Sequence, residues 1–186
     1  FHMHHLVKWL AHGSALIGGI VLLGLIMLTT LSILGRELSK LGHAMENGMG
    51  AAIVALGVDE IRGTYELTEA GVAFAIFAFL PVCQFYGQHA TVDVFTSGLR
   101  ARVLGWLRAF WEVVLTGVIL FIALRLYEGM QRYLGNGETT LFLQFPVWWA
   151  YALAVGAAVV ASIVALYCAY ARVMEAATGR RLLPEA

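Results

Sequence analysis

The stretch ALIGGIVLLGLIMLTTLSIL, residues 15–34, contains no charged side chain. A helix of this length can cross the hydrocarbon core of a bilayer, which requires roughly 20 apolar residues. Two further runs, 70–88 and 141–171, are also uncharged and long enough to span. Together the three runs predict a protein that crosses the membrane several times.

A fourth apolar segment, at about 103–126, is interrupted by Glu112 and Arg125. We still expect it to span, because residues 113–124 are apolar and long charged side chains can extend toward the headgroups. The sequence therefore predicts an all-α integral membrane protein whose transmembrane helices lie at approximately 10–34, 68–87, 103–127 and 146–171.

Composition agrees with this fold class. The 186 residues are 60% hydrophobic and 13% charged, whereas soluble domains carry about 25% charged residues. We expect one transmembrane domain over residues 1–186, surrounded by membrane lipids. The net charge is zero, so nothing indicates a nucleic-acid partner. The two cysteines lie inside predicted spans, where isolated cysteines usually act as small apolar residues.

The distribution of Lys and Arg predicts that both termini are cytoplasmic (N-in, C-in). In that orientation seven basic residues flank the spans on the inside: Lys8, Arg100, Arg102, Arg108, Arg172, Arg180 and Arg181. Five lie on the outside: Arg36, Lys40, Arg62, Arg125 and Arg132.

The first loop contains an amphipathic pattern. Leu38, Leu41, Met45 and Met49 recur at three- and four-residue spacing, with charged residues between them. This predicts an additional helix at approximately 37–50, which either lies in the membrane interface or packs on the bundle.

Few polar residues fall inside the spans. Glu112 follows Arg108 by four residues, so the two can pair on one helix face. Contact with a partner subunit or a proton-coupling role are the alternatives for Glu112. Pro81 should bend the second span and face protein, because it leaves a backbone carbonyl without its helical partner.

The chain shows no pattern typical of an enzyme. It contains no zinc-ligand spacing, no nucleotide-binding glycine loop and no serine–histidine pair at membrane depth. No histidine lies in the second, third or fourth predicted span, which disfavours haem ligation between helices. We therefore expect neither an enzyme nor a cofactor.

Residues 66–102 carry a family resemblance. ELTEAGVAF (66–74) leads through an apolar helix to QHATVD (88–93), followed by Leu99-Arg100-Ala101-Arg102. This resembles the small membrane subunit (DctQ type) of tripartite ATP-independent periplasmic (TRAP) transporters. The family positions are an acidic residue opening the second helix, a His-x-x-Val-Asp motif and a basic turn: here Glu69, His89 with Asp93, and Arg100 with Arg102.

Two further features support the resemblance. Arg36 follows the first span, and Gly137-Glu138-Thr139-Thr140 with Phe145-Pro146-Val147-Trp148 is similar to the start of the family's fourth helix. The chain departs from the pattern in carrying Ser32 where an asparagine often precedes the arginine. Its first loop is also longer than the family leads us to expect.

The resemblance implies a non-catalytic scaffold subunit in the bacterial inner membrane. Its partners would be a large multi-span membrane subunit, which carries out sodium-coupled uptake of a carboxylate-type solute, and a periplasmic solute-binding protein. The candidate structural, subunit or lipid contacts are Arg36, Glu66, Glu69, Pro81, His89, Asp93, Arg100, Arg102, Arg108 and Glu112. The alternatives are a small homodimeric transporter that uses Glu112, and the membrane anchor subunit of an oxidoreductase.

Overall fold

The computed structural model describes residues 2–44, 61–87 and 101–178, and this part of the chain folds into four helices. These are α1 (His2–Ala44), α3 (Thr64–Tyr86), α4 (Ala101–Asn136) and α5 (Trp148–Thr178). Each is long and apolar enough to cross a membrane. Each predicted span falls on one helix, although α1 and α4 are longer than predicted, so the all-α prediction with four long apolar helices is confirmed.

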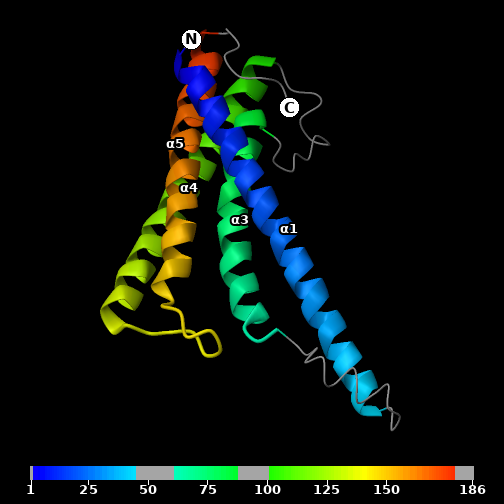
Figure 1. Cartoon of the computed structure of the whole chain (residues 1–186). Coiled ribbons are helices and arrows are strands. Elements are labelled where there is room, and N and C mark those ends of the chain that lie inside the picture. The colour runs from blue at the N-terminus through cyan, green and yellow to red at the C-terminus, as the bar shows by residue number, and fades with distance from the viewer. Residues whose placement is uncertain (1, 45–60, 88–100, 179–186) are drawn as a thin grey trace.

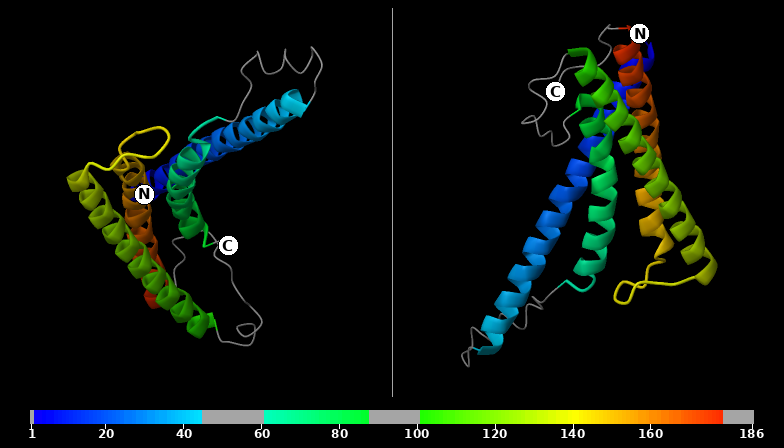
Figure 2. Two further views of the ribbon diagram at one scale, coloured as in Figure 1. Left: turned by 90° about the horizontal axis from the view of Figure 1, so that it is seen from below. Right: turned by 180° about the vertical axis from the view of Figure 1, so that it is seen from behind.

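The helices form two pairs that meet at one end and diverge at the other (Figure 1). α1 packs on α3, α4 packs on α5, and contacts of α5 with α3 and α1 join the pairs. The N-terminal end of α1 and the C-terminal end of α5 lie together at the convergent end, and the right view of Figure 2 shows the same divergence from behind.

The core lies at the convergent end because small side chains let the backbones approach closely there. α5 buries a row of alanines, among them Ala158, Ala161 and Ala165, each no more than 1% exposed. Between α1 and α3, a Cβ atom added to Gly18 would come within 2.9 Å of the Ala78 Cβ. The absence of a side chain at Gly18 is therefore what permits the α1–α3 contact.

The predicted separate helix at 37–50 differs from the structure. Residues 37–44 are the last turns of α1, and residues 45–50 lie outside the described residues. The helix continues because no proline interrupts it and because charged side chains stabilise its end. Lys40 Nζ lies 2.9 Å from Glu37 Oε1, three residues away, and Arg36 Nε lies 3.5 Å from the same oxygen.

A short loop, residues 137–147 (the α4–α5 loop), connects the diverging ends of α4 and α5. Two backbone bonds close it: Thr140 N–H to Phe145 O at 2.9 Å, and Val147 N–H to Glu138 O at 3.0 Å. Gly137, with φ of 65°, ends α4 in the left-handed region that glycine adopts readily. These backbone bonds order the loop independently of its contact with α3.

Candidate functional site

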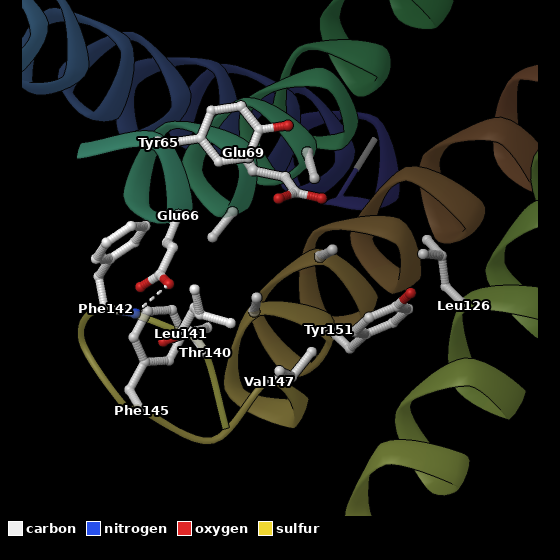
Figure 3. Close-up of a pocket in the computed structure, with 14 residues that line it drawn as sticks. Tyr65, Glu66, Glu69, Leu126, Thr140, Leu141, Phe142, Phe145, Val147 and Tyr151 are labelled. Atoms are coloured by element: carbon white, nitrogen blue, oxygen red, sulfur yellow. Dashed lines mark hydrogen bonds between the residues drawn. The ribbon is translucent and has the colours of Figure 1, made fainter. Parts of the chain in front are cut away.

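At the divergent end, the Glu66 carboxylate binds the α4–α5 loop to the start of α3. Its Oε1 accepts the Phe142 N–H at 2.7 Å (Figure 3), and its Oε2 accepts the Leu143 N–H at 3.0 Å. A carboxylate that accepts two backbone N–H groups forms charge-assisted bonds, which are stronger than neutral ones. The two Glu66 bonds therefore join the α1–α3 pair to the α4–α5 pair at the end where the two pairs diverge.

A cavity of about 540 Å³ lies behind this contact (Figure 3). Alanines form its sides, Ala70 and Ala73 from α3 and Ala150 and Ala154 from α5, and their small side chains leave the space unfilled. The remaining lining residues are Tyr65, Glu66, Glu69, Leu126, Thr140, Leu141, Phe142, Phe145, Val147 and Tyr151.

A second cavity, of about 260 Å³, lies between α1 and the start of α3. Arg36, Ser32 and Tyr65 are among its lining residues, and Tyr65 also lines the larger cavity. Ser32 is 4% exposed, and its Oγ accepts the Ile61 N–H at 3.2 Å. The structure thus brings the candidates Arg36, Glu66 and Glu69 to the same end of the molecule.

A buried polar contact links the helices at the convergent end. Gln84 Nε2 donates to Glu112 Oε1 at 2.7 Å, and the two residues are 1% and 7% exposed. Thr116 Oγ1 donates to the carbonyl of Glu112 at 2.8 Å and to that of Ala165 at 3.2 Å. Arg172 interacts electrostatically with Glu112. These residues connect α3, α4 and α5.

The expected pair between Arg108 and Glu112 is not formed. Arg108 is exposed, and none of the four ion pairs within residues 2–44, 61–87 and 101–178 joins the two. The helix is rotated so that Glu112 points into the bundle, where Gln84 supplies a donor. Sequence reasoning missed Gln84, although a polar side chain within an uncharged span was a signal that could have found it.

The other candidates are placed as follows. Pro81 is fully buried within α3, in agreement with the expectation that it faces protein. Arg102 is exposed at the start of α4. His89, Asp93 and Arg100 lie outside the described residues, so their expected roles stay predictions.

Two histidines that the sequence left without a role hold α1 against the bundle. His12 Nε2 lies 3.1 Å from the Tyr86 hydroxyl, and His4 Nδ1 lies 3.3 Å from the Tyr167 hydroxyl. The His4 ring also packs on Phe85, with 5.3 Å between ring centroids. The N-terminal end of α1 is therefore fixed to α3 and α5 by aromatic and polar contacts together.

Comparison with known proteins identifies the family. No curated protein and no solved structure matches the chain significantly. A family model does match, over residues 25–175, and is described as tripartite ATP-independent periplasmic transporters, DctQ component. The match includes parts of all four helices, both cavities and the Gln84–Glu112 contact. The chain is therefore a multi-pass membrane protein that belongs to the DctQ component family of TRAP transporters.

Proposed function

We propose that this chain is the small, non-catalytic scaffold subunit of a TRAP-type secondary transporter in the bacterial inner membrane. It packs on the large membrane subunit, which carries out sodium-coupled uptake of a carboxylate-type solute delivered by a periplasmic binding protein. Family membership supports the assignment, since the DctQ component is one part of a transporter that also has a large membrane component and a binding protein.

The scaffold assignment rests on the hydrogen bonds that the buried polar groups make within the protein. A solute that crosses the bilayer needs polar groups to replace its hydration. In the described part of the chain, five buried polar residues bond within the protein: Ser32, Gln84, Glu112, Thr116 and Ser162. The exception is a single hydroxyl, the buried Thr140 Oγ1 in the α4–α5 loop, which has no hydrogen-bond partner there. Such a bundle offers a polar solute no pathway of its own.

The outer faces of the bundle support a role in packing. Within the described residues, α4 packs along α5 and touches α3 near Gln84 and Leu80, so most of its circumference is left for lipid or a partner. Its exposed side chains are large and apolar, for example Trp106, Phe110 and Phe121, each more than 50% exposed. Aromatic side chains are typical of interface cores between proteins.

The end of α1 offers a second surface. Because Arg36 still lines the second cavity beside the start of α3, it is residues 37–44 that extend past α3, over a helix length of about 12 Å at 1.5 Å per residue. We infer that this segment, with the loop that follows it up to residue 66, braces the large subunit or the binding protein on the outer side. This placement follows from the N-in, C-in orientation that the Lys and Arg distribution predicts.

Neither alternative function fits as well. A homodimeric transporter that uses Glu112 would need a solute-accessible carboxylate, but Glu112 is buried and bonded to Gln84. An oxidoreductase anchor is disfavoured by the family match to a transporter component.

Copurification tests the proposal. The tagged chain is extracted from its native membrane in mild detergent, and the proteins recovered with it are identified by mass spectrometry. We expect a much larger multi-span protein at near-equal amount, together with sodium-dependent uptake that requires a binding protein. Recovery of this chain alone, as an oligomer whose uptake is abolished by Glu112→Gln, would contradict the proposal.

A pair of variants tests the bracing segment. Leu41→Lys changes an apolar residue that is 58% exposed on the extended end of α1, and it should lower recovery of the large subunit. Lys40→Ala, at the adjacent position, alters the charged side and should leave recovery unchanged. Equal recovery with both variants would refute a bracing role for this end of α1.

A further inference from the structure

We propose that the 540 Å³ cavity between α3, α5 and the α4–α5 loop binds one acyl chain of a phospholipid with a primary-ammonium headgroup, and that Glu69 recognises the headgroup. The inference does not depend on the scaffold role, because the cavity is formed by this chain alone.

The size and surface of the cavity suit a hydrocarbon chain. Its volume falls within the roughly 300–1,000 Å³ typical of small-ligand pockets. Ala70, Ala73, Ala154, Leu126 and Phe145 give it mainly apolar walls. An empty space between apolar walls deprives the lining atoms of dispersion contacts. Between membrane helices, the apolar molecule at hand is the lipid tail.

The cavity is built into the fold rather than left by loose packing. Glu66 binds the α4–α5 loop through two backbone N–H groups, at 2.7 and 3.0 Å, and so holds Phe142 and its neighbours across the space between α3 and α5. The loop keeps the two helices apart at this end, while alanines bring the same helices together at the other. Three of the lining alanines, Ala70, Ala73 and Ala150, are partly exposed and therefore face space instead of each other.

Charge selects the headgroup. Glu66 and Glu69 are the acidic side chains among the lining residues, and no Lys or Arg is among them. Glu66 is occupied by the loop, whereas the exposed Glu69 makes no hydrogen bond or ion pair with any residue in the described ranges. An anionic headgroup would meet this carboxylate with no compensating cation. A primary ammonium group complements it.

The position of the cavity fits the level of the headgroups. Glu69 lies in the second turn of α3, and Tyr65 and Tyr151 line the cavity beside it (Figure 3). Tyrosine is enriched where the hydrocarbon core meets the headgroups. A tail can then enter between α3 and α5 while its headgroup stays beside Glu69.

Lipid retention in the assembled transporter tests the proposal. The complex is reconstituted into vesicles of equal phosphatidylethanolamine and phosphatidylglycerol, extracted again, and its retained lipid is quantified by mass spectrometry. Ala73→Trp fills the cavity, and Val72→Trp is its matched control, one residue away, 38% exposed and outside the lining. Glu69→Gln removes the charge and keeps the cavity.

We expect the unaltered complex and Val72→Trp to retain phosphatidylethanolamine, and Ala73→Trp to lose that lipid. Glu69→Gln should retain lipid with a preference for phosphatidylethanolamine about two- to fivefold weaker, the range for a solvent-accessible ion pair. If Ala73→Trp does not accumulate, Ala73→Leu gives the same readout with a smaller change. Equal retention by the filled variant, no retained lipid in the unaltered complex, or a segment of the large subunit cross-linked into the cavity would overturn the proposal.

Discussion

Replacing Gln84 by leucine should destabilise the bundle, because the change removes the side-chain donor to the buried Glu112 carboxylate. The bond is 2.7 Å long, and both residues are at least nine-tenths buried. Hydrogen bonds to charged groups contribute about 1.5–3 kcal/mol in soluble proteins. Side-chain bonds within a membrane average about 0.6 kcal/mol. We therefore expect a loss of about 1–2 kcal/mol in the free energy of unfolding, or about tenfold in the equilibrium.

The measurement is a double-mutant cycle with Gln84→Leu, Glu112→Leu and the combined variant. Unfolding is followed by circular dichroism as the denaturing detergent fraction rises in mixed micelles. The combined variant leaves neither polar group without a partner. Its loss of stability should therefore be smaller than the sum of the two single losses, by a coupling energy of about 1 kcal/mol. Ser162→Ala is the control, since its hydroxyl donates to Ala158 O of its own helix, at 2.7 Å, and so does not join two helices.

Strict additivity of the two single changes would refute the reasoning. It would mean that the two side chains contribute independently and that their contact does not hold α3 to α4. If Ser162→Ala lowered the free energy of unfolding as much as Gln84→Leu, that would also contradict the reasoning. Removing any buried polar group would then have the same effect, whether or not the group joins two helices.

Three further predictions concern the helix ends and the α1–α3 contact. Glu66→Gln should speed hydrogen exchange at the amides of the α4–α5 loop, because a neutral amide offers one acceptor oxygen where the carboxylate offers two, whereas Glu69→Gln should leave that exchange unchanged. Gly18→Ala should weaken the bundle by about 1–3 kcal/mol as an overpacked contact; Gly19→Ala, where an added Cβ meets nothing within 4 Å, should be neutral or slightly stabilising in the same detergent titration. Gly63→Ala should lower stability by about 1 kcal/mol or more, since φ is 81° and the new methyl group would collide with Leu143; an unchanged midpoint would show that the start of α3 can rearrange.

Helix number and position could be predicted because lipid imposes one requirement on every span. A charge-free run of sufficient length, such as residues 15–34 or 141–171, has few other ways to satisfy its backbone in a bilayer. Even α4 was identified correctly despite Glu112, because the apolar residues after it are long enough to span. The end of α1 was predicted wrongly. The side-chain pattern changes near residue 37 because the surroundings of the helix change there, but the backbone helix continues to Ala44.

The contacts that shape the sites could not be predicted, because they depend on how each helix is rotated. Helices that are apolar all round give little indication of which face turns inward. Gln84 and Glu112 are 28 residues apart, and Glu66 and Phe142 are 76 apart. Local spacing instead favoured Arg108 as the partner of Glu112. The family resemblance pointed to Glu66 and Glu69 by position. The structure was needed to show that Glu66 binds a loop and that Glu69, within the part of the chain it describes, makes no hydrogen bond or ion pair beside a cavity.

The divergence of the two helix pairs has a mechanical consequence. Joined at one end and apart at the other, the pairs give the molecule a wedge-shaped profile, so one leaflet must accommodate a larger cross-sectional area than the other (Figure 1). Lateral pressure in that leaflet then acts on the angle between the pairs. Lipids that crowd the wide end would press α3 and α5 together, and lipids that relax it would let them open. The bilayer's own stress profile thereby becomes one of the forces that set the shape of this subunit.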